Sequence, residues 1–180
     1  MLSIFCDHPS LIQSLPSISF KFVIIDLPWC SVRAFNAYAW TPNELAGINA
    51  AIQYDQLILN ADGLYTDDEL TLIESNIKSQ QLNTLFDGIR LQDPGLIDWA
   101  KQLGFNHIHI NMETGGQSLD TIQTIANMGV SNITLNHDIP YAELITICQS
   151  MPACELVVQG PIIIQYAKRA FYSDYSHAAD

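Results

Sequence analysis

Short runs of apolar residues alternate with segments of helical period along the whole chain. The apolar runs are continuous rather than interrupted at every second residue, which is typical of parallel strands that are covered on both faces. The expected strands lie at residues 2–6, 22–26, 57–60, 88–91, 107–111, 132–136 and 155–158. This pattern predicts seven strand–helix units joined by right-handed crossovers.

The segments between these runs carry helix start and stop signals. Thr41-Pro-Asn-Glu44 and Thr66-Asp-Asp-Glu69 have the spacing of a capping box, in which the first and last residues satisfy each other's backbone N–H groups. Asp93 precedes a proline, as a helix cap often does. Gly104 and Gly129 stand where helix-ending glycines are expected.

The alternation of strands and helices predicts an α/β fold, and we expect one partial domain over residues 1–180 that resembles a TIM barrel. It would have about seven parallel βα units and an incomplete eighth, since a complete barrel typically takes about 250 residues. An open parallel α/β sheet is the alternative, although no Gly-x-Gly-x-x-Gly follows the first expected strand. Unpaired edge strands expose backbone donors and acceptors. We therefore expect a second copy of the chain, a paralogue or the terminal segments to cover the gap.

Composition excludes several functional classes. The chain of 180 residues has 7 Lys+Arg against 19 Asp+Glu and a net charge of −12, which disfavours direct binding to nucleic acid. It has no apolar run of about eighteen residues, so we expect no membrane span. Its N-terminus does not resemble a signal peptide, and its four cysteines show no Cys-x-x-Cys spacing. These features favour a cytoplasmic protein with reduced thiols.

Polar residues follow the expected strands, at the edge where parallel sheets bind their ligands. The expected ligand-binding residues are Asp26, Asn60, Asp93, Asn111 and Gln159. The candidate catalytic residues are Arg33, Glu113 and His137. Arg33 could bind a carboxylate with two parallel hydrogen bonds, and His137 beside Asp138 could transfer protons. Asp93 has an alternative role as a helix cap. His107 and His109 are interpreted as core residues rather than ligands, and no spacing in the sequence specifies a metal site.

The chain also resembles a known family at several motifs. Residues 155–175 read as a strand, a Gly-Pro turn and a helix, and they are similar to the signature segment of the collagenase-like peptidase family, family thirty-two of the peptidases of unknown mechanism. Further resemblances follow in the family's order, at residues 30–36, 41–45, 59–70, 91–96, 108–109 and 129–135. The resemblance therefore spans nearly the whole chain. It implies a barrel and, by the family's name, peptide hydrolysis.

The signature positions depart from the family. They usually hold a histidine and cysteines, but this chain has Gln159, Ile163 and Ala170. In branches that hydroxylate ubiquinone precursors or RNA bases without oxygen, the resemblance implies an iron–sulfur cluster held by cysteines, and Cys30 stands where one branch has a ligand. From the missing cysteines we predict no such cofactor, and a non-redox accessory or small-ligand-binding protein. The alternatives are an active family enzyme and a truncated gene product.

Overall fold

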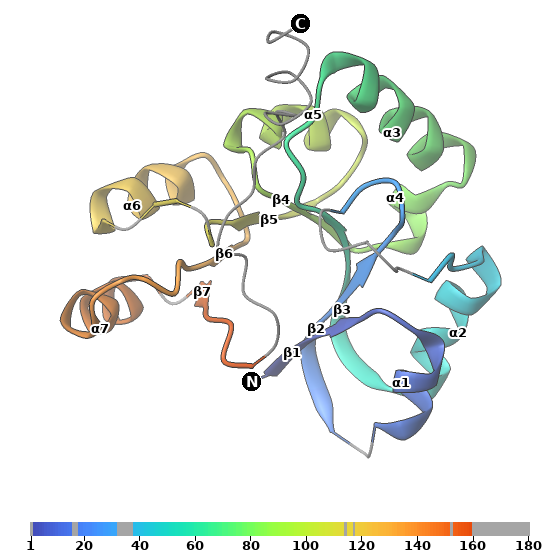
Figure 1. Cartoon of the computed structure of the whole chain (residues 1–180), viewed down its shortest axis with the longest axis horizontal. Helices are drawn as coiled ribbons and strands as arrows, with labels where there is room; N and C mark the ends of the chain where they lie inside the picture. The colour runs from blue at the N-terminus through green and yellow to red at the C-terminus, as the bar shows by residue number, and fades with distance from the viewer. Residues whose placement is uncertain are drawn as a thin grey trace, which may run out of the picture.

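The computed structural model describes residues 2–15, 18–31, 38–113, 115–116, 118–151 and 153–159. Within them, seven strands form one parallel sheet in chain order. The strands are β1 (Leu2–Cys6), β2 (Ser19–Asp26), β3 (Gln53–Ala61), β4 (Gly88–Leu91), β5 (His107–Asn111), β6 (Asn132–Thr134) and β7 (Cys154–Glu155). The sheet curls into a half-barrel with the helices around its outside (Figure 1). The predicted TIM-barrel-like α/β fold is therefore confirmed.

Helices follow the strands as the sequence predicts. They are α1 (Pro9–Ser14), α2 (Pro42–Ala51), α3 (Asp67–Ser79), α4 (Leu82–Leu85), the 3₁₀ helix η1 (Pro94–Leu96), α5 (Ile97–Gln102), α6 (Leu119–Asn127) and α7 (Tyr141–Ser150). Both predicted capping boxes are present, at Thr41 and Thr66. Gly104 and Gly129 have φ angles of 94° and 84°, which L side chains rarely adopt. None of the described helices is long and apolar enough to cross a membrane.

The strand boundaries differ from the apolar runs in an informative way. β3 begins at Gln53 rather than at residue 57, because its first residues pair with β2: Ser19 lies opposite Gln53, and Phe20 lies opposite Tyr54. The first four residues of β3 alternate between exposed and half-buried and include polar side chains, so hydrophobicity alone gave no signal for them. β7 has only two residues, fewer than the run at 155–158 predicts.

The two faces of the sheet have different surroundings. The outward side chains, such as Ile25, Leu59 and Ile89, pack in one large core with helix residues such as Ile48 and Ile77. Inside the curl, the apolar contacts are few, and Phe5 packs there on a small cluster of Phe22, Ile24 and Ile58. Side chains point alternately to the two faces along each strand, which identifies the other residues of the inner face. Many of them are polar. The buried polar residues on the inner face are Asp26, Asn60, Arg90, His109, Asn111, Asn132 and Thr134.

The curl brings the first and last described strands together. Ser3 Oγ of β1 donates a hydrogen bond of 3.0 Å to Glu155 Oε2 of β7, although the two residues are 152 positions apart. β1 and β7 remain the edges of the described sheet. Completion of the barrel by a second copy or a paralogue therefore stays a prediction.

Candidate functional site

Arg90 is the centre of a buried hydrogen-bonded network at the carboxyl ends of the strands. β4 places it on the inner face, where its side chain is fully shielded from solvent. Nη1 donates to Asn60 Oδ1 at 3.2 Å and to Asp62 Oδ2 at 3.4 Å, and Nε donates to Thr134 Oγ1 at 3.4 Å. Nη2 lies 3.9 Å from Glu113 Oε2. Two carboxylates therefore face a single buried cation, as burial of a charge requires.

Asn60 connects Arg90 to the end of β2. The strand register places Asn60 opposite both Asp26 and Arg90. Its Nδ2 donates to Asp26 Oδ1 at 2.7 Å and to Ser31 Oγ at 3.2 Å, and Ser31 Oγ donates to Asp62 Oδ1 at 2.9 Å. Because its amide oxygen accepts from Arg90 while its amide nitrogen donates to Asp26, the orientation of Asn60 is fixed.

Asn111 and Glu113 form the other side of the network. Asn111 Oδ1 accepts from the backbone N–H of Glu113 at 3.2 Å, which turns the chain after β5. Asn111 Nδ2 donates to Glu113 Oε2 at 3.2 Å. This local turn places the buried Glu113 carboxylate beside the Arg90 guanidinium.

The Cys30 thiol ties the loop after β2 to β3. Its Sγ donates to the backbone oxygen of Asn60 at 3.2 Å, and Tyr65 Oη donates to the backbone oxygen of Cys30. Burial raises the pKa of the Cys30 thiol well above its usual value, and the nearby Asp26 and Asp62 raise it further. The Cys30 thiol is therefore a protonated hydrogen-bond donor in this structure.

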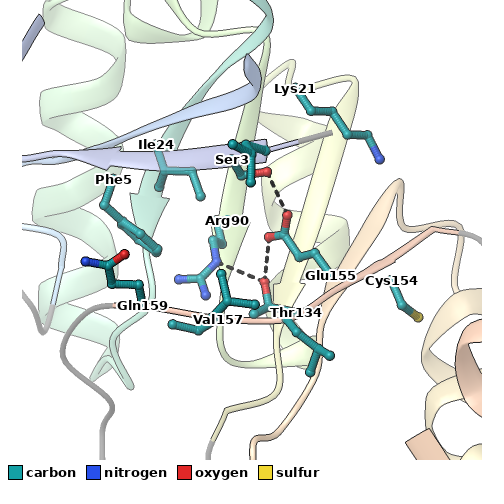
Figure 2. A pocket seen from close by; sticks show the side chains of 13 residues that line it. Ser3, Phe5, Lys21, Ile24, Arg90, Thr134, Cys154, Glu155, Val157 and Gln159 are labelled. Carbon is teal, nitrogen blue, oxygen red and sulfur yellow. Dashed lines mark hydrogen bonds between the residues drawn. The ribbon is translucent and has the colours of Figure 1, made fainter. Parts of the chain in front are cut away.

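A cavity of about 430 Å³ opens between β1 and β7, on the inner side of Arg90 (Figure 2). We call it the seam cavity. Its lining residues are Leu2, Ser3, Phe5, Lys21, Ile24, Arg90, Thr134, Cys154, Glu155, Leu156, Val157, Val158 and Gln159. The Glu155 carboxylate accepts from Thr134 Oγ1 at 2.9 Å and from Ser3 Oγ at 3.0 Å. Arg90 thus belongs both to the buried network and to the wall of the cavity.

His109 and Asn132 lie opposite each other on the inner face of β5 and β6. Both are fully buried, and neither the ring nitrogens of His109 nor the amide of Asn132 has a hydrogen-bond partner among the described residues. The His109 ring meets the Phe22 ring edge-on, with centroids 4.4 Å apart. Burial lowers the pKa of His109 to about 3, and the charges of Arg90, His107 and Lys21 act in the same direction. His109 is therefore a neutral group in the interior.

Comparison with known proteins assigns the chain to a family. The model of peptidase family U32 matches residues 22–180. The chain belongs to peptidase family U32. Its structure is similar to that of the U32 peptidase Mk0906, with a TM-score of 0.60 and 12% identity over 87% of this chain and 67% of that chain. At this identity the similarity shows the shared fold.

A more distant likeness is to Arabidopsis ADAL complexed with GMP, with a TM-score of 0.46 and 12% identity over 88% of this chain and 54% of that chain. No curated protein matches the sequence.

Four of the predicted site residues of this U32 chain come together. Asp26, Asn60, Asn111 and Glu113 all lie in the network around Arg90. Gln159 is exposed and lines the seam cavity instead.

Two further predicted site residues, Asp93 and His137, lie elsewhere in the described structure. Asp93 caps η1, with its Oδ1 accepting from the N–H of Gly95 at 2.8 Å, which is the structural role that the sequence also allowed. His137 is exposed, and its Nε2 lies 3.5 Å from Asp138 Oδ1. Arg33 lies outside the described residues, as do Ile163 and Ala170 of the signature segment.

Sequence reasoning missed four residues of the U32 site: Arg90, Asp62, Thr134 and Glu155. A signal for Arg90 existed, because it is the one charged residue in the apolar run Gly88–Leu91. A charge within a buried strand needs a partner, so its position already implied an interior carboxylate. His109 takes the place in the core that the sequence allowed, since its side chain is fully buried; its ring faces the interior of the half-barrel, without a hydrogen bond to any described residue.

An iron–sulfur centre is held by cysteine thiolates gathered around it. The four thiols are spread over different elements: Cys6 ends β1, Cys30 follows β2, Cys148 is exposed on α7 and Cys154 lies in β7. Across the part of the chain that the structure describes, no three His, Cys, Asp or Glu side chains are grouped to hold a metal ion.

Proposed function

We propose that this U32 chain binds a small polar ligand inside the half-barrel and acts as a non-redox accessory protein. The observation that carries this proposal is the buried network around Arg90, which lies directly behind the wall of the seam cavity. A volume of about 430 Å³ is within the range of small-molecule sites. Ligands of parallel α/β barrels bind at the carboxyl ends of the strands, where this network lies.

The network supports binding because it is already organised. Arg90 is held by Asn60, Asp62 and Thr134, and Asn60 is held in turn by Asp26. Side chains that are fixed before binding lose little entropy when a ligand arrives. A polar ligand would therefore meet a rigid wall around Arg90.

The non-redox role is supported by the surroundings of Cys30. Its buried thiol donates to a backbone oxygen, and the described residues hold no group of three His, Cys, Asp or Glu side chains that could bind a metal. Metal analysis of protein purified without oxygen tests this part of the proposal. We expect less than stoichiometric iron and no visible absorption of a cluster. Iron at four atoms per chain would contradict it.

Peptide hydrolysis is the second candidate function, because the family and the similar solved structure are both named as peptidases. The buried Glu113 carboxylate, oriented by Asn111, is the group that we would assign to proton transfer. Incubation with a peptide library, followed by mass spectrometry, tests this role. Cleavage by the wild type but not by Glu113→Gln would support hydrolysis and contradict the accessory role.

Ligand binding itself is tested by native mass spectrometry of gently purified protein and by a thermal-shift screen of polar small molecules. The informative variant is Val157→Trp, which fills the seam cavity without changing a charge. The matched control is Ile145→Trp, on the exposed side of α7. We expect the wild type and the control to bind at least one ligand that Val157→Trp does not bind. Binding that is the same in all three proteins, or absent from all three, would contradict the proposal.

A further inference from the structure

Glu155 presents its carboxylate to the seam cavity (Figure 2). Oε1 accepts one hydrogen bond from Thr134, and Oε2 accepts one from Ser3. A carboxylate oxygen can accept two hydrogen bonds, so each oxygen retains capacity for another donor. The two hydroxyl groups hold the carboxylate in place between β1 and β6, which leaves it oriented before any ligand binds.

Several residues of the cavity wall are apolar. Phe5 and Ile24 come from β1 and β2, and Leu156 and Val157 follow β7. A ligand in this space would therefore place a hydrocarbon group against these side chains and a polar group against Glu155. Burial of such a hydrocarbon group contributes about 25 cal/mol for each Å² removed from water.

The charges around the cavity favour a cation as the polar group. The positive charge of Arg90 is already faced by Asp62 and Glu113. Lys21 also lines the cavity, but its ammonium group points away from the Glu155 carboxylate (Figure 2) and lies 4.8 Å from the centre of the Phe22 ring. Glu155 is therefore the cavity charge that can attract a ligand, and the chain's net charge of −12 adds to the attraction of cations.

We propose that the seam cavity binds a primary ammonium group carried on an apolar body, with the Glu155 carboxylate as its partner. This inference rests on the proposed ligand-binding function and names the ligand class. An apolar amino acid with its carboxyl group blocked has this chemistry, and so does the N-terminal residue of a peptide. Both present three N–H donors next to a hydrocarbon side chain.

Isothermal titration calorimetry at neutral pH with leucinamide tests the proposal. 4-Methylpentanamide is the matched compound, because it keeps the hydrocarbon and amide groups and lacks the amine. We expect leucinamide to bind at least about tenfold more tightly, as a hydrogen bond between charged groups predicts. The tripeptide Leu-Gly-Gly separates the two sources of the amine: affinity equal to or above that of leucinamide indicates a peptide N-terminus, and clearly weaker affinity indicates a free small amine.

Two variants assign the binding to Glu155. Glu155→Gln keeps the shape of the side chain and removes its charge, and we expect at least about tenfold weaker leucinamide binding. Glu143→Gln, in the exposed first turn of α7, is the matched control and should bind as the wild type does. Val157→Trp provides a second test in case Glu155→Gln does not fold, because it fills the cavity and leaves Glu155 intact. We expect it to abolish leucinamide binding.

The outcomes separate the two proposals. Equal affinity for leucinamide and 4-methylpentanamide, or an unchanged affinity in Glu155→Gln, would overturn the assignment to amines. In that case, the proposed ligand-binding function would still stand if another ligand bound to the wild type but not to Val157→Trp. If no compound binds in a manner sensitive to Val157→Trp, both proposals are wrong.

Discussion

Arg90 and Asp62 form an ion pair with both side chains fully shielded from solvent, and 3.4 Å separates Nη1 from Oδ2. Glu113 Oε2 lies 3.9 Å from the Nη2 atom of the same guanidinium. The three groups join β4 to the chain segments that follow β3 and β5. The polar part of the half-barrel interior is therefore organised around the Arg90 guanidinium, beside the small apolar cluster of Phe22, Ile24 and Ile58.

Replacing Arg90 should destabilise the protein strongly. Arg90→Met leaves the carboxyl groups of Asp62 and Glu113 buried without their cation, and we expect a loss of about 3–5 kcal/mol in the free energy of unfolding. Urea denaturation measures it. Lys101→Met is the control, since it removes only an exposed ion pair with Asp98 and an exposed hydrogen bond to the backbone oxygen of Met128, and it should cost about 1 kcal/mol. Equal losses in the two variants would contradict the role given to Arg90.

The fold could be predicted from the sequence because its signals are local. Each apolar run marks a strand, and the capping boxes at Thr41 and Thr66 mark helix starts that the structure confirms. These signals depend on residues three or four positions apart, so neighbouring residues suffice to reveal them. The parallel order of the strands then follows from the alternation of strands with helices.

The candidate site could be predicted only in part, because its contacts join distant strands. The sequence predicts that Asn60 lies at a strand end, but the hydrogen bonds of Asn60 with Asp26 and Arg90 depend on the register of three strands. The Ser3–Glu155 bond depends on the curl of the whole sheet. No local pattern specifies that curl, which explains why the seam cavity and Glu155 were missed.

His109 should make stability depend on pH. Its pKa is about 3 in the folded protein because of burial, against an ordinary value of 6.5. Between these values the unfolded chain takes up a proton that the folded chain does not. The free energy of unfolding is therefore unaffected by His109 well above pH 6.5. As the pH drops from 6.5 toward 3, it falls by up to about 1.4 kcal/mol per pH unit.

His109→Leu isolates this contribution. Because the ring nitrogens lack a hydrogen-bond partner among the described residues, the variant should unfold within about 1 kcal/mol of the wild type at pH 7. At pH 5 it should gain roughly 2 kcal/mol relative to the wild type. Urea denaturation at the two pH values measures both quantities. Parallel pH profiles of the two proteins would contradict this, because they would show that His109 takes up its proton as readily in the folded protein as in the unfolded chain.

Thr66 should stabilise α3 through its capping box. Its Oγ1 accepts from the N–H of Glu69, and the Glu69 carboxylate accepts from the N–H of Thr66. Thr66→Ala should cost about 1 kcal/mol, as the loss of an N-cap does. Thr71→Ala, on the exposed surface of the same helix, should cost clearly less, since the Thr71 hydroxyl only donates to the backbone oxygen of Asp67. Thermal unfolding of the two variants measures both losses. A lower melting temperature for Thr71→Ala than for Thr66→Ala would contradict the role given to the cap.

The four thiols should differ in reactivity. Cys148 is exposed, whereas Cys6 and Cys30 are buried and burial raises the pKa of both thiols. In the folded protein we expect rapid iodoacetamide labelling of Cys148, slow labelling of Cys154 and protection of the other two until urea is added. Peptide mapping by mass spectrometry identifies each site. Early labelling of Cys30 would contradict its role as a buried donor to Asn60.

The central claim is that the interior next to Arg90 and Glu155 is a ligand site. Crystals of the gently purified protein, soaked with a mixture of small polar and amine-bearing fragments, test it most directly through the electron density of the seam cavity. The account predicts a fragment between Phe5, Arg90 and Glu155, with a donor nitrogen about 3 Å from a Glu155 carboxylate oxygen. A cavity filled by the protein's own side chains, with fragments bound only elsewhere, would contradict it.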